Sequence, residues 1–134
     1  MTVETLAILM PGDMGHGCAI AFRENGFRVV TNLSGRSDRT KGLAAKAQIE
    51  DLGSFEEVAR QADLVLSILP PENAIDQGRV FADAMIAAGS TPPYVDCNAI
   101  APSTTEKVGA EIARAGALYI DGGIIGNNPV AENG

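Results

Sequence analysis

Residues 6–17 read Leu-Ala-Ile-Leu-Met-Pro-Gly-Asp-Met-Gly-His-Gly, and this stretch decides the fold. An apolar run suited to a buried strand ends in closely spaced glycines, and a helix-like pattern follows directly. Glycines let the backbone approach a ligand closely, and a helix that starts there points unpaired N–H groups at it. The stretch therefore predicts a strand–turn–helix unit that holds a phosphate group, although glycines after a strand also form ordinary turns.

The length, composition and charge of the chain limit the class of protein to which it can belong. A chain of 134 residues suffices for one domain with one core, and only 4% of its residues are aromatic, so we expect an aliphatic core. The formal net charge of −7 argues against nucleic acid and anionic membranes as partners. No apolar run approaches the ~18 residues of a membrane span. Because no secretory signal is visible, we expect a cytoplasmic protein with reduced cysteines.

Strand and helix patterns alternate along the rest of the chain. Strands are predicted at 5–10, 27–32, 49–51, 64–69, 94–98 and 118–121, and helices at 14–24, 38–48, 54–61, 73–88 and 102–115. Six strands separated by helices predict an α/β fold, a doubly wound parallel sheet with the strand order of a Rossmann domain. Ligands of such sheets bind at the carboxyl ends of the strands. That edge would gather residues 11–14, 34–37, 69–71, 98–102 and 122–126.

The end of the second predicted strand bears on which dinucleotide is bound. NAD sites generally place Asp or Glu about 20 residues after the glycine turn, but positions 32–34 hold Asn, Leu and Ser. Arg36 and Arg39 offer planar, bidentate donors for an additional phosphate, and Ser34 and Ser37 offer hydroxyl groups. We therefore predict NADP rather than NAD as the cofactor. The alternative is a solvated basic turn.

Further cofactor contacts are predicted from the other strand ends. The residues expected at the pyrophosphate are Pro11, Gly12, Asp13, Met14 and Gly15. Leu69, Pro70 and Pro71 end an apolar strand and would line the ribose, but a simple strand stop explains them equally well. Asn98 carries both a donor and an acceptor for a carboxamide or a substrate hydroxyl. A role in forming a turn explains this Asn equally well. Gly126 would lie with Asn98 nearest the substrate.

Other reactive side chains give no catalytic pattern. Cys18 and Cys97 have no nearby His and form no Cys-x-x-Cys pair, so we expect no metal or redox site. Cys97 is predicted at a buried strand position. His16 is expected at the surface, with the cofactor phosphates as the alternative. Ser54, followed three residues later by Glu57, is expected to cap the helix at 54–61, and Ser103 or Thr104 is expected to cap the last helix.

Four stretches resemble the cofactor domain of the β-hydroxyacid dehydrogenase family, which includes hydroxyisobutyrate and phosphogluconate dehydrogenases and imine reductases. Residues 12–15 resemble its Gly-x-Met-Gly turn, and residues 35–37 its Arg-containing turn for the adenosine phosphate. Residues 95–102 resemble its Asp-x-Ser-Thr-x-x-Pro segment near the nicotinamide, and residues 121–126 its Asp-Ala-Pro-Val-Ser-Gly substrate motif. Within the family, the sequences of these motifs are most similar to a phosphogluconate-dehydrogenase-like branch. The resemblance covers nearly all of the chain.

The resemblance implies an NADP-dependent oxidoreductase that transfers hydride between the nicotinamide and a small hydroxy acid or related polar substrate. Asn98 and Ala99 stand where the family has Ser and Thr, and Ile125 replaces the serine of the substrate motif. Since Ile125 cannot donate a hydrogen bond to a carboxylate, these departures argue against a small 2-methyl-3-hydroxy acid as the substrate.

The resemblance also implies a division of the protein. In the family a catalytic Lys follows the substrate motif, and a helical domain then closes the active site, usually in a homodimer. Lys41, Lys46 and Lys107 do not match that position, so no catalytic residue is predicted here. We expect an NAD(P)-binding domain at 1–126 and, at 127–134, the start of a linker toward a helical domain of a longer enzyme.

Two alternatives belong to other functional classes. A non-catalytic NADP-binding sensor or regulatory module would also lack the catalytic Lys. A methyltransferase of related fold usually needs an acidic residue after the second strand for the adenosine ribose, which this chain does not have there.

Overall fold

The computed structural model describes residues 3–9, 13–34, 37–68, 71–97 and 101–122, without the side chains of residues 13–15 and 71. Six parallel strands form one sheet with the order β3-β2-β1-β4-β5-β6, which confirms the predicted Rossmann-like α/β fold. The strands are β1 (Thr5–Leu9), β2 (Arg28–Thr31), β3 (Glu50–Asp51), β4 (Leu64–Ser67), β5 (Tyr94–Asp96) and β6 (Tyr119–Asp121).

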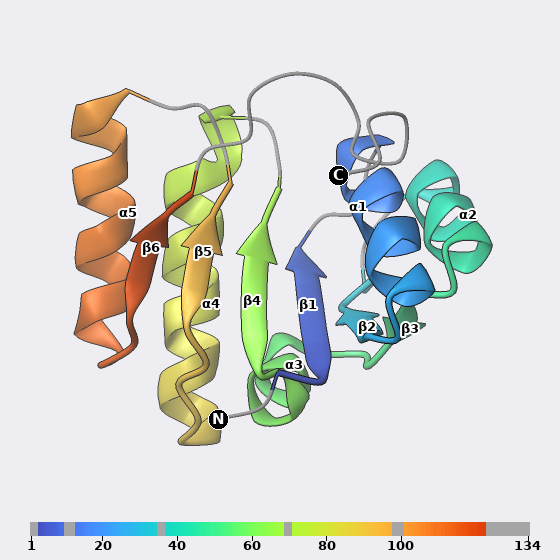
Figure 1. The fold of residues 1–134 in the computed structure, drawn as a ribbon. Helices are drawn as coiled ribbons and strands as arrows, with labels where there is room; N and C mark the ends of the chain where they lie inside the picture. The colour runs from blue at the N-terminus through green and yellow to red at the C-terminus, as the bar shows by residue number, and fades with distance from the viewer. Residues whose placement is uncertain (1–2, 10–12, 35–36, 69–70, 98–100, 123–134) are drawn as a thin grey trace.

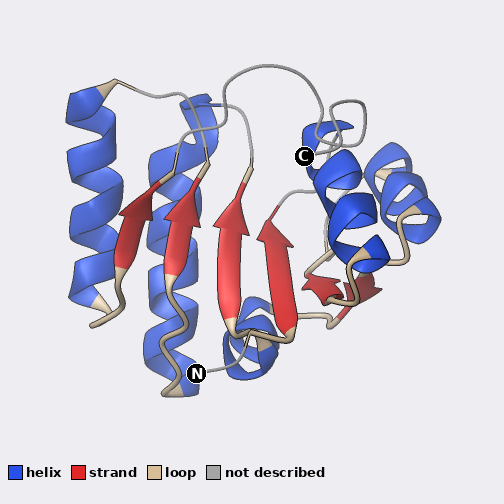
Figure 2. Ribbon diagram, viewed as in Figure 1, coloured by secondary structure: helices blue, strands red, loops and turns tan. Residues whose placement is uncertain are grey.

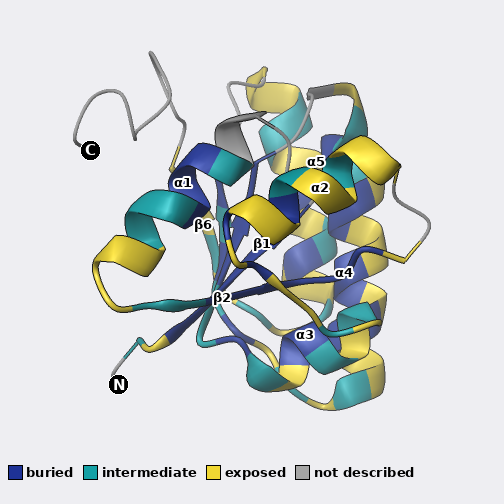
Figure 3. Ribbon diagram, turned by 90° about the vertical axis from the view of Figure 1, so that its right-hand side faces the viewer, coloured by how far each residue is buried: buried dark blue, intermediate teal, exposed yellow. Residues whose placement is uncertain are grey.

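Helices cover the two faces of the sheet. One layer lies over the β1–β3 part of one face, and the other covers the opposite face (Figures 1 and 3). The first layer is α1 (Asp13–Glu24) and α2 (Asp38–Lys46), and the second is α3 (Phe55–Gln61), α4 (Ala74–Ala88) and α5 (Pro102–Arg114), with a short 3₁₀ turn η1 (Pro71–Asn73) before α4. Among the described residues, no helix is both long and apolar enough to cross a membrane.

Each helical layer has its own apolar cluster. Successive residues of a strand point to opposite faces, so Ala7 and Leu9 join the α3–α5 side while Ile8 joins the α1–α2 side. The α1–α2 cluster is aliphatic apart from Cys18 and the partly buried Phe22 and Cys97. The prediction of an aliphatic core is therefore confirmed for this layer.

The same prediction is wrong for the α3–α5 layer. Phe55, Phe81, Tyr94 and Tyr119 form a continuous row there, with neighbouring ring centroids 5.9 to 6.4 Å apart. Tyr94 and Phe81 are the largest fully buried side chains among the described residues. Composition counts aromatic residues but carries no information on their clustering, which depends on how α3 and α4 pack against β5 and β6.

Helix ends differ in how the first turn is stabilised. Ser54 Oγ accepts the Glu57 N–H at 3.2 Å, which confirms the cap expected from the sequence. The expected Ser103 or Thr104 cap is wrong, because Ala101 is the N-cap of α5 and makes no side-chain cap bond. The second helix ends at Lys46 rather than Gln48, since Gln48 takes the left-handed conformation with φ of 58°.

Asp63 joins the start of β4 to the start of β1. Its Oδ2 accepts the backbone N–H groups of Glu4 at 2.9 Å and Thr5 at 3.0 Å. Both bonds favour the charged carboxylate, and they hold the pKa of Asp63 below its usual value.

We expect Asp63→Ala to lower the free energy of unfolding at pH 7 by about 1 kcal/mol. Because the pKa is lowered in the folded state, this stabilisation is complete above the pKa of the unfolded carboxyl, about 4, and is lost as pH falls through the folded value. Urea unfolding at stepped pH measures the difference between parent and variant, with the exposed Glu106→Ala as control. A difference that persists unchanged into strong acid would contradict the assignment.

Candidate functional site

The candidate site lies at the carboxyl edge of the sheet. All five strand pairings are parallel, so the strands end along one edge, at the arrowheads in Figure 2. The strand order reverses between β1 and β4, because the chain moves from β1 to β2 on one side and returns to β4 on the other. Open α/β sheets bind ligands at such a reversal.

Helix α1 begins at this reversal. Pro11 and Gly12 lie outside the described residues, while Asp13, Met14 and Gly15 form the first helical turn directly after β1. A helix of 12 residues places about half an elementary positive charge at its start, together with N–H groups that have no partner within the helix. The start of α1, which holds the described part of the predicted pyrophosphate turn, would therefore stabilise an anion.

His16 differs from its expected surface position. The residue is half-buried, and its Nε2 atom is buried without a hydrogen-bond partner within the described structure. His16, Ile20 and Arg23 share one face of α1. Arg23 Nη2 donates to Gln48 Oε1 at 2.6 Å, just beyond α2, so this face is turned toward α2. The ring nitrogen is a candidate contact for a ligand on that side.

The end of β2 is held by hydrogen bonds from three side chains. Asn32, at the position of the acidic residue in NAD sites, is buried, and its Oδ1 accepts the Ser34 N–H at 3.0 Å. Ser34 Oγ donates to the Gly53 carbonyl at 2.9 Å. Asp51 Oδ1 accepts the N–H groups of Leu33 at 3.1 Å and Gly53 at 2.9 Å. Sequence reasoning missed Asp51, because it inspected only the strand that follows the glycine turn.

The start of α2 carries the rest of the predicted phosphate pocket. Ser37 is its N-cap: Ser37 Oγ accepts the Thr40 N–H at 3.2 Å and donates to Thr40 Oγ1 at 3.1 Å. Ser37 and Arg39 are exposed, and Arg36 lies outside the described residues. Since the Ser34 and Ser37 protons both have protein acceptors, these hydroxyls are arranged to accept rather than donate further hydrogen bonds.

The predicted ribose and substrate contacts fall mostly beyond the described structure. Pro71 begins η1, but its side chain is not described. The predicted contacts outside the described residues are Leu69, Pro70, Asn98 and Gly126.

Sequence reasoning also missed a polar cluster where β4, β5 and β6 end. Asp96 is 1% exposed, and its Oδ2 accepts the Tyr119 hydroxyl at 2.9 Å. The backbone continues the pairing, with Cys97 N–H donating to Ser67 O at 3.0 Å and Gly122 N–H donating to Asp96 O at 2.8 Å. Burial and the bond to Asp96 raise the pKa of Tyr119. Only the register of β5 and β6 brings this pair together, so no local pattern signals it.

The two cysteines have the properties of unreactive thiols. Burial raises the pKa of Cys18 and raises the pKa of Cys97 to about 11, so few thiolates form near neutral pH. Cys97 is half-buried and follows β5, which corrects its predicted buried strand position. Within the described ranges no three His, Cys, Asp or Glu side chains gather to hold a metal ion.

Comparisons with known proteins extend over almost the whole chain. Residues 6–134 match the family model of the NAD binding domain of 6-phosphogluconate dehydrogenase. The uncharacterized 28.5 kDa protein in the 7S RNA 5′ region of Methanothermus fervidus is 27% identical over 87 residues, which are 65% of this chain and 33% of that protein.

Two solved structures show the same fold. The conserved protein MTH1747 of unknown function, described as structurally similar to 3-hydroxyacid dehydrogenases, aligns with a TM-score of 0.80 and 26% identity over 92% of this chain. Mycobacterium tuberculosis 3-hydroxyisobutyrate dehydrogenase aligns with a TM-score of 0.77 and 22% identity over 97% of this chain. The chain spans 44% of the length of each.

Gly122 provides a test of the packing at the end of β6. A Cβ atom built there would lie 2.9 Å from Val95 Cγ1, closer than real contacts allow. We expect Gly122→Ala to lower the free energy of unfolding by about 1–2 kcal/mol through overpacking. Thermal and urea unfolding measure this loss, and adding Val95→Ala should recover part of it. A single variant as stable as the parent would contradict this packing.

Proposed function

The chain belongs to the family of NAD binding domains of 6-phosphogluconate dehydrogenase, and from that premise we propose that it binds NADP for an oxidoreductase. The reaction proposed is hydride transfer between the nicotinamide and a small hydroxy acid or related polar substrate. One observation carries the proposal: α1 starts at the reversal of strand order, and residues 13–15 of the glycine-containing motif form its first turn. The buried Nε2 of His16 near that start has no hydrogen-bond partner among the described residues, which also fits a bound ligand.

The residues of the turn would bind and orient the cofactor. Gly12, Met14 and Gly15 would approach the pyrophosphate with Pro11 and Asp13 beside them, because the backbone N–H groups and the helix charge favour an anion there. When bound, the cofactor supplies the hydride chemistry, and the protein supplies binding, orientation and electrostatics.

The preference for NADP rests on the end of β2 and the start of α2. Asn32 takes the place of a carboxylate that would repel a 2′-phosphate. Asp51 brings a carboxylate from β3, but its Oδ1 is occupied by two backbone N–H groups, which partly offset its charge. Arg36 and Arg39 would pair with the phosphate, while Ser34 and Ser37 would line the same pocket.

The remaining contacts are proposed around the other strand ends. Leu69, Pro70 and Pro71 would line the ribose, and Asn98 with Gly126 would face the substrate. Ile125 cannot donate a hydrogen bond to a carboxylate. We therefore favour a polar substrate other than a small 2-methyl-3-hydroxy acid.

The chain spans less than half of the structures it matches, so the whole reaction is proposed rather than observed. We propose residues 1–126 as the cofactor domain and 127–134 as the start of a linker. The general acid/base and a homodimer interface would belong to a helical domain.

A non-catalytic NADP sensor is the second candidate, because the described lysines, Lys41, Lys46 and Lys107, lie on α2 and α5. Incubation with NADPH and candidate 3-oxo acids, followed by the absorbance of the reduced nicotinamide, separates the two functions. Turnover supports the oxidoreductase, and tight binding without turnover by the full-length protein supports the sensor.

We expect the chain to bind NADPH more tightly than NADH, by on the order of 1.5–3 kcal/mol if charge-assisted bonds reach the 2′-phosphate. Arg36→Glu should abolish or reverse the preference, because a carboxylate repels that phosphate. Calorimetric titration measures both affinities, and Lys107→Glu, which changes the charge of an exposed α5 residue equally, is the control. Equal affinities in the parent would contradict the phosphate pocket.

A further inference from the structure

Gln77 is a buried polar side chain that the fold does not use. It is 6% exposed, and its Nε2 atom has no hydrogen-bond partner within the described structure. The other two glutamines of the sequence, Gln48 and Gln61, form hydrogen bonds through their carboxamides. A buried donor without an acceptor destabilises a folded chain, and such groups are rare. We therefore expect the acceptor to belong to a bound molecule.

Gln77 lies in the first turn of α4, at the carboxyl edge of the sheet. Helix α4 follows β4 through the short turn η1. Ala74 and Phe81, one turn before and after Gln77, are buried in the apolar cluster on the α3–α5 side, so Gln77 shares the inner face of the helix. Because side chains of a helix tilt toward its start, the carboxamide is directed at the carboxyl edge, where this fold binds ligands.

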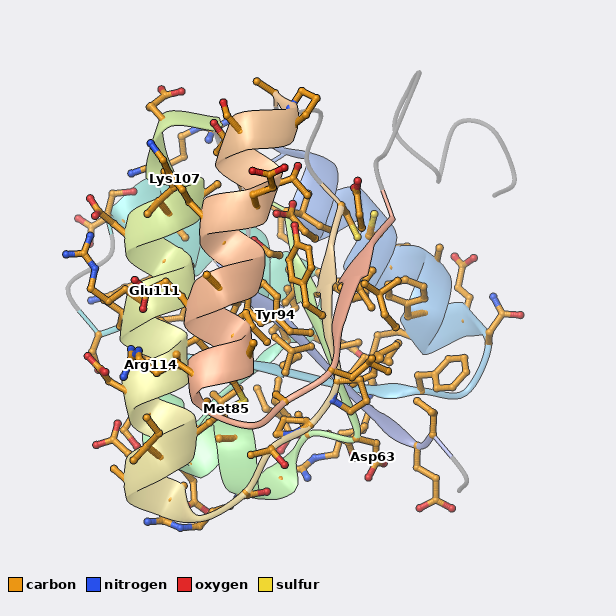
Figure 4. All side chains as sticks on the ribbon, turned by 90° about the vertical axis from the view of Figure 1, so that its left-hand side faces the viewer. Asp63, Met85, Tyr94, Lys107, Glu111 and Arg114 are labelled. Atoms are coloured by element: carbon orange, nitrogen blue, oxygen red, sulfur yellow. The ribbon has the colours of Figure 1, made fainter. Side chains whose placement is uncertain are left out.

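Gln77 is turned toward α3 rather than α5. Figure 4 shows α4 and α5 side by side along one face of the sheet, and Gly78 lies at their contact, since a Cβ there would lie 3.2 Å from Val108 Cγ1. Gln77 is displaced from Gly78 by about 100° around the helix, toward the side of Ala84. Ala84 lines a hollow together with Phe55 of α3.

The α3 side leads to the end of β2. Phe81, one turn after Gln77, packs against Phe55 with ring centroids 6.0 Å apart. Phe55 begins α3, two residues after Gly53, whose carbonyl accepts the Ser34 hydroxyl at 2.9 Å. Ser34 belongs to the proposed pocket for the 2′-phosphate. Gln77 therefore lies on the side of α4 that faces the proposed adenosine half of the cofactor.

The chemistry of a carboxamide matches an adenine base. Adenine offers a ring nitrogen that accepts a hydrogen bond beside an amino group that donates one, and a Gln side chain can pair with both. We propose that Gln77 binds the adenine base of the cofactor, with its Nε2 donating to a ring nitrogen. The inference rests on the proposed function, which places a dinucleotide at this edge of the sheet.

Gln77→Met tests this contact, because it removes the carboxamide and keeps an unbranched buried side chain. We expect NADPH and 2′,5′-ADP to bind about tenfold more weakly. The melting temperature without ligand should not fall, since Nε2 has no partner among the described residues. Gln61→Met is the matched control: it removes a carboxamide that donates to Glu57 at 2.7 Å on α3, and both affinities should stay unchanged.

Calorimetry measures the affinities, and thermal melting measures the stability of each variant. Unchanged affinities in Gln77→Met, as expected for a carboxamide that binds only water, would overturn the inference. A lower melting temperature without ligand would also overturn it, because it indicates a structural role. A parent that binds neither ligand would instead contradict the proposed function.

NMR of the parent chain gives a second test that does not depend on the folding of a variant. In ¹⁵N spectra of the glutamine side chains, 2′,5′-ADP should shift the Gln77 signals and leave those of Gln61 in place. Reduced nicotinamide mononucleotide, which lacks adenine, should shift neither. A Gln77 signal that stays in place when 2′,5′-ADP is bound, or that moves with the mononucleotide, would overturn the inference.

Discussion

The structure depends on the burial of β1 on both faces and its pairing on both edges. All five of its residues are buried, and it pairs with β2 on one side and β4 on the other. A parallel strand that is apolar on both faces requires helices above and below it. Because the chain leaves β1 toward β2 and later returns to β4, the described connections diverge and leave an opening at the carboxyl end of β1. Helix α1 starts at that opening.

Polar side chains lie at the carboxyl ends of the strands on both sides of the opening. Asn32 and Asp51 bind backbone N–H groups around the end of β2, and Asp96 binds the Tyr119 hydroxyl at the end of β5. Asn32 and Asp96 are buried, and buried polar groups that have their hydrogen-bond partners within the protein stabilise the local backbone. His16 differs, since its buried Nε2 has no partner within the described structure. Hydrogen-bonded polar groups therefore hold the strand ends on both sides of the opening.

Family membership and geometry answer different parts of the functional question. Membership establishes an NAD(P)-binding domain of the dehydrogenase and reductase superfamily. Geometry shows where the strand order reverses, and open α/β sheets bind their ligands at such a reversal. In the proposed function the choice of substrate would depend on the segments after β5 and β6, where Asn98, Ala99 and Ile125 depart from the family pattern that the sequence resembles.

The sequence by itself determined the order and type of the elements. Apolar runs, glycine stops and the Ser54 cap are local signals, so strands and helices were predicted within a few residues of their observed bounds. The sheet order was expected from the Rossmann pattern of alternating strands and helices, and right-handed crossovers predicted that all strands end at one edge. The glycine turn and the missing acidic residue after β2 could likewise be read from neighbouring positions.

Only the tertiary structure decided which distant groups meet. Asp51 reaches Leu33 from β3, Tyr119 reaches Asp96 from β6, and four aromatic rings line up beneath α3–α5. These contacts depend on strand register and on the close approach of α5 at Gly109, which packing of the whole molecule sets. Local periodicity specifies which face a side chain occupies, but the partner across the sheet is chosen by the summed burial of every strand and helix.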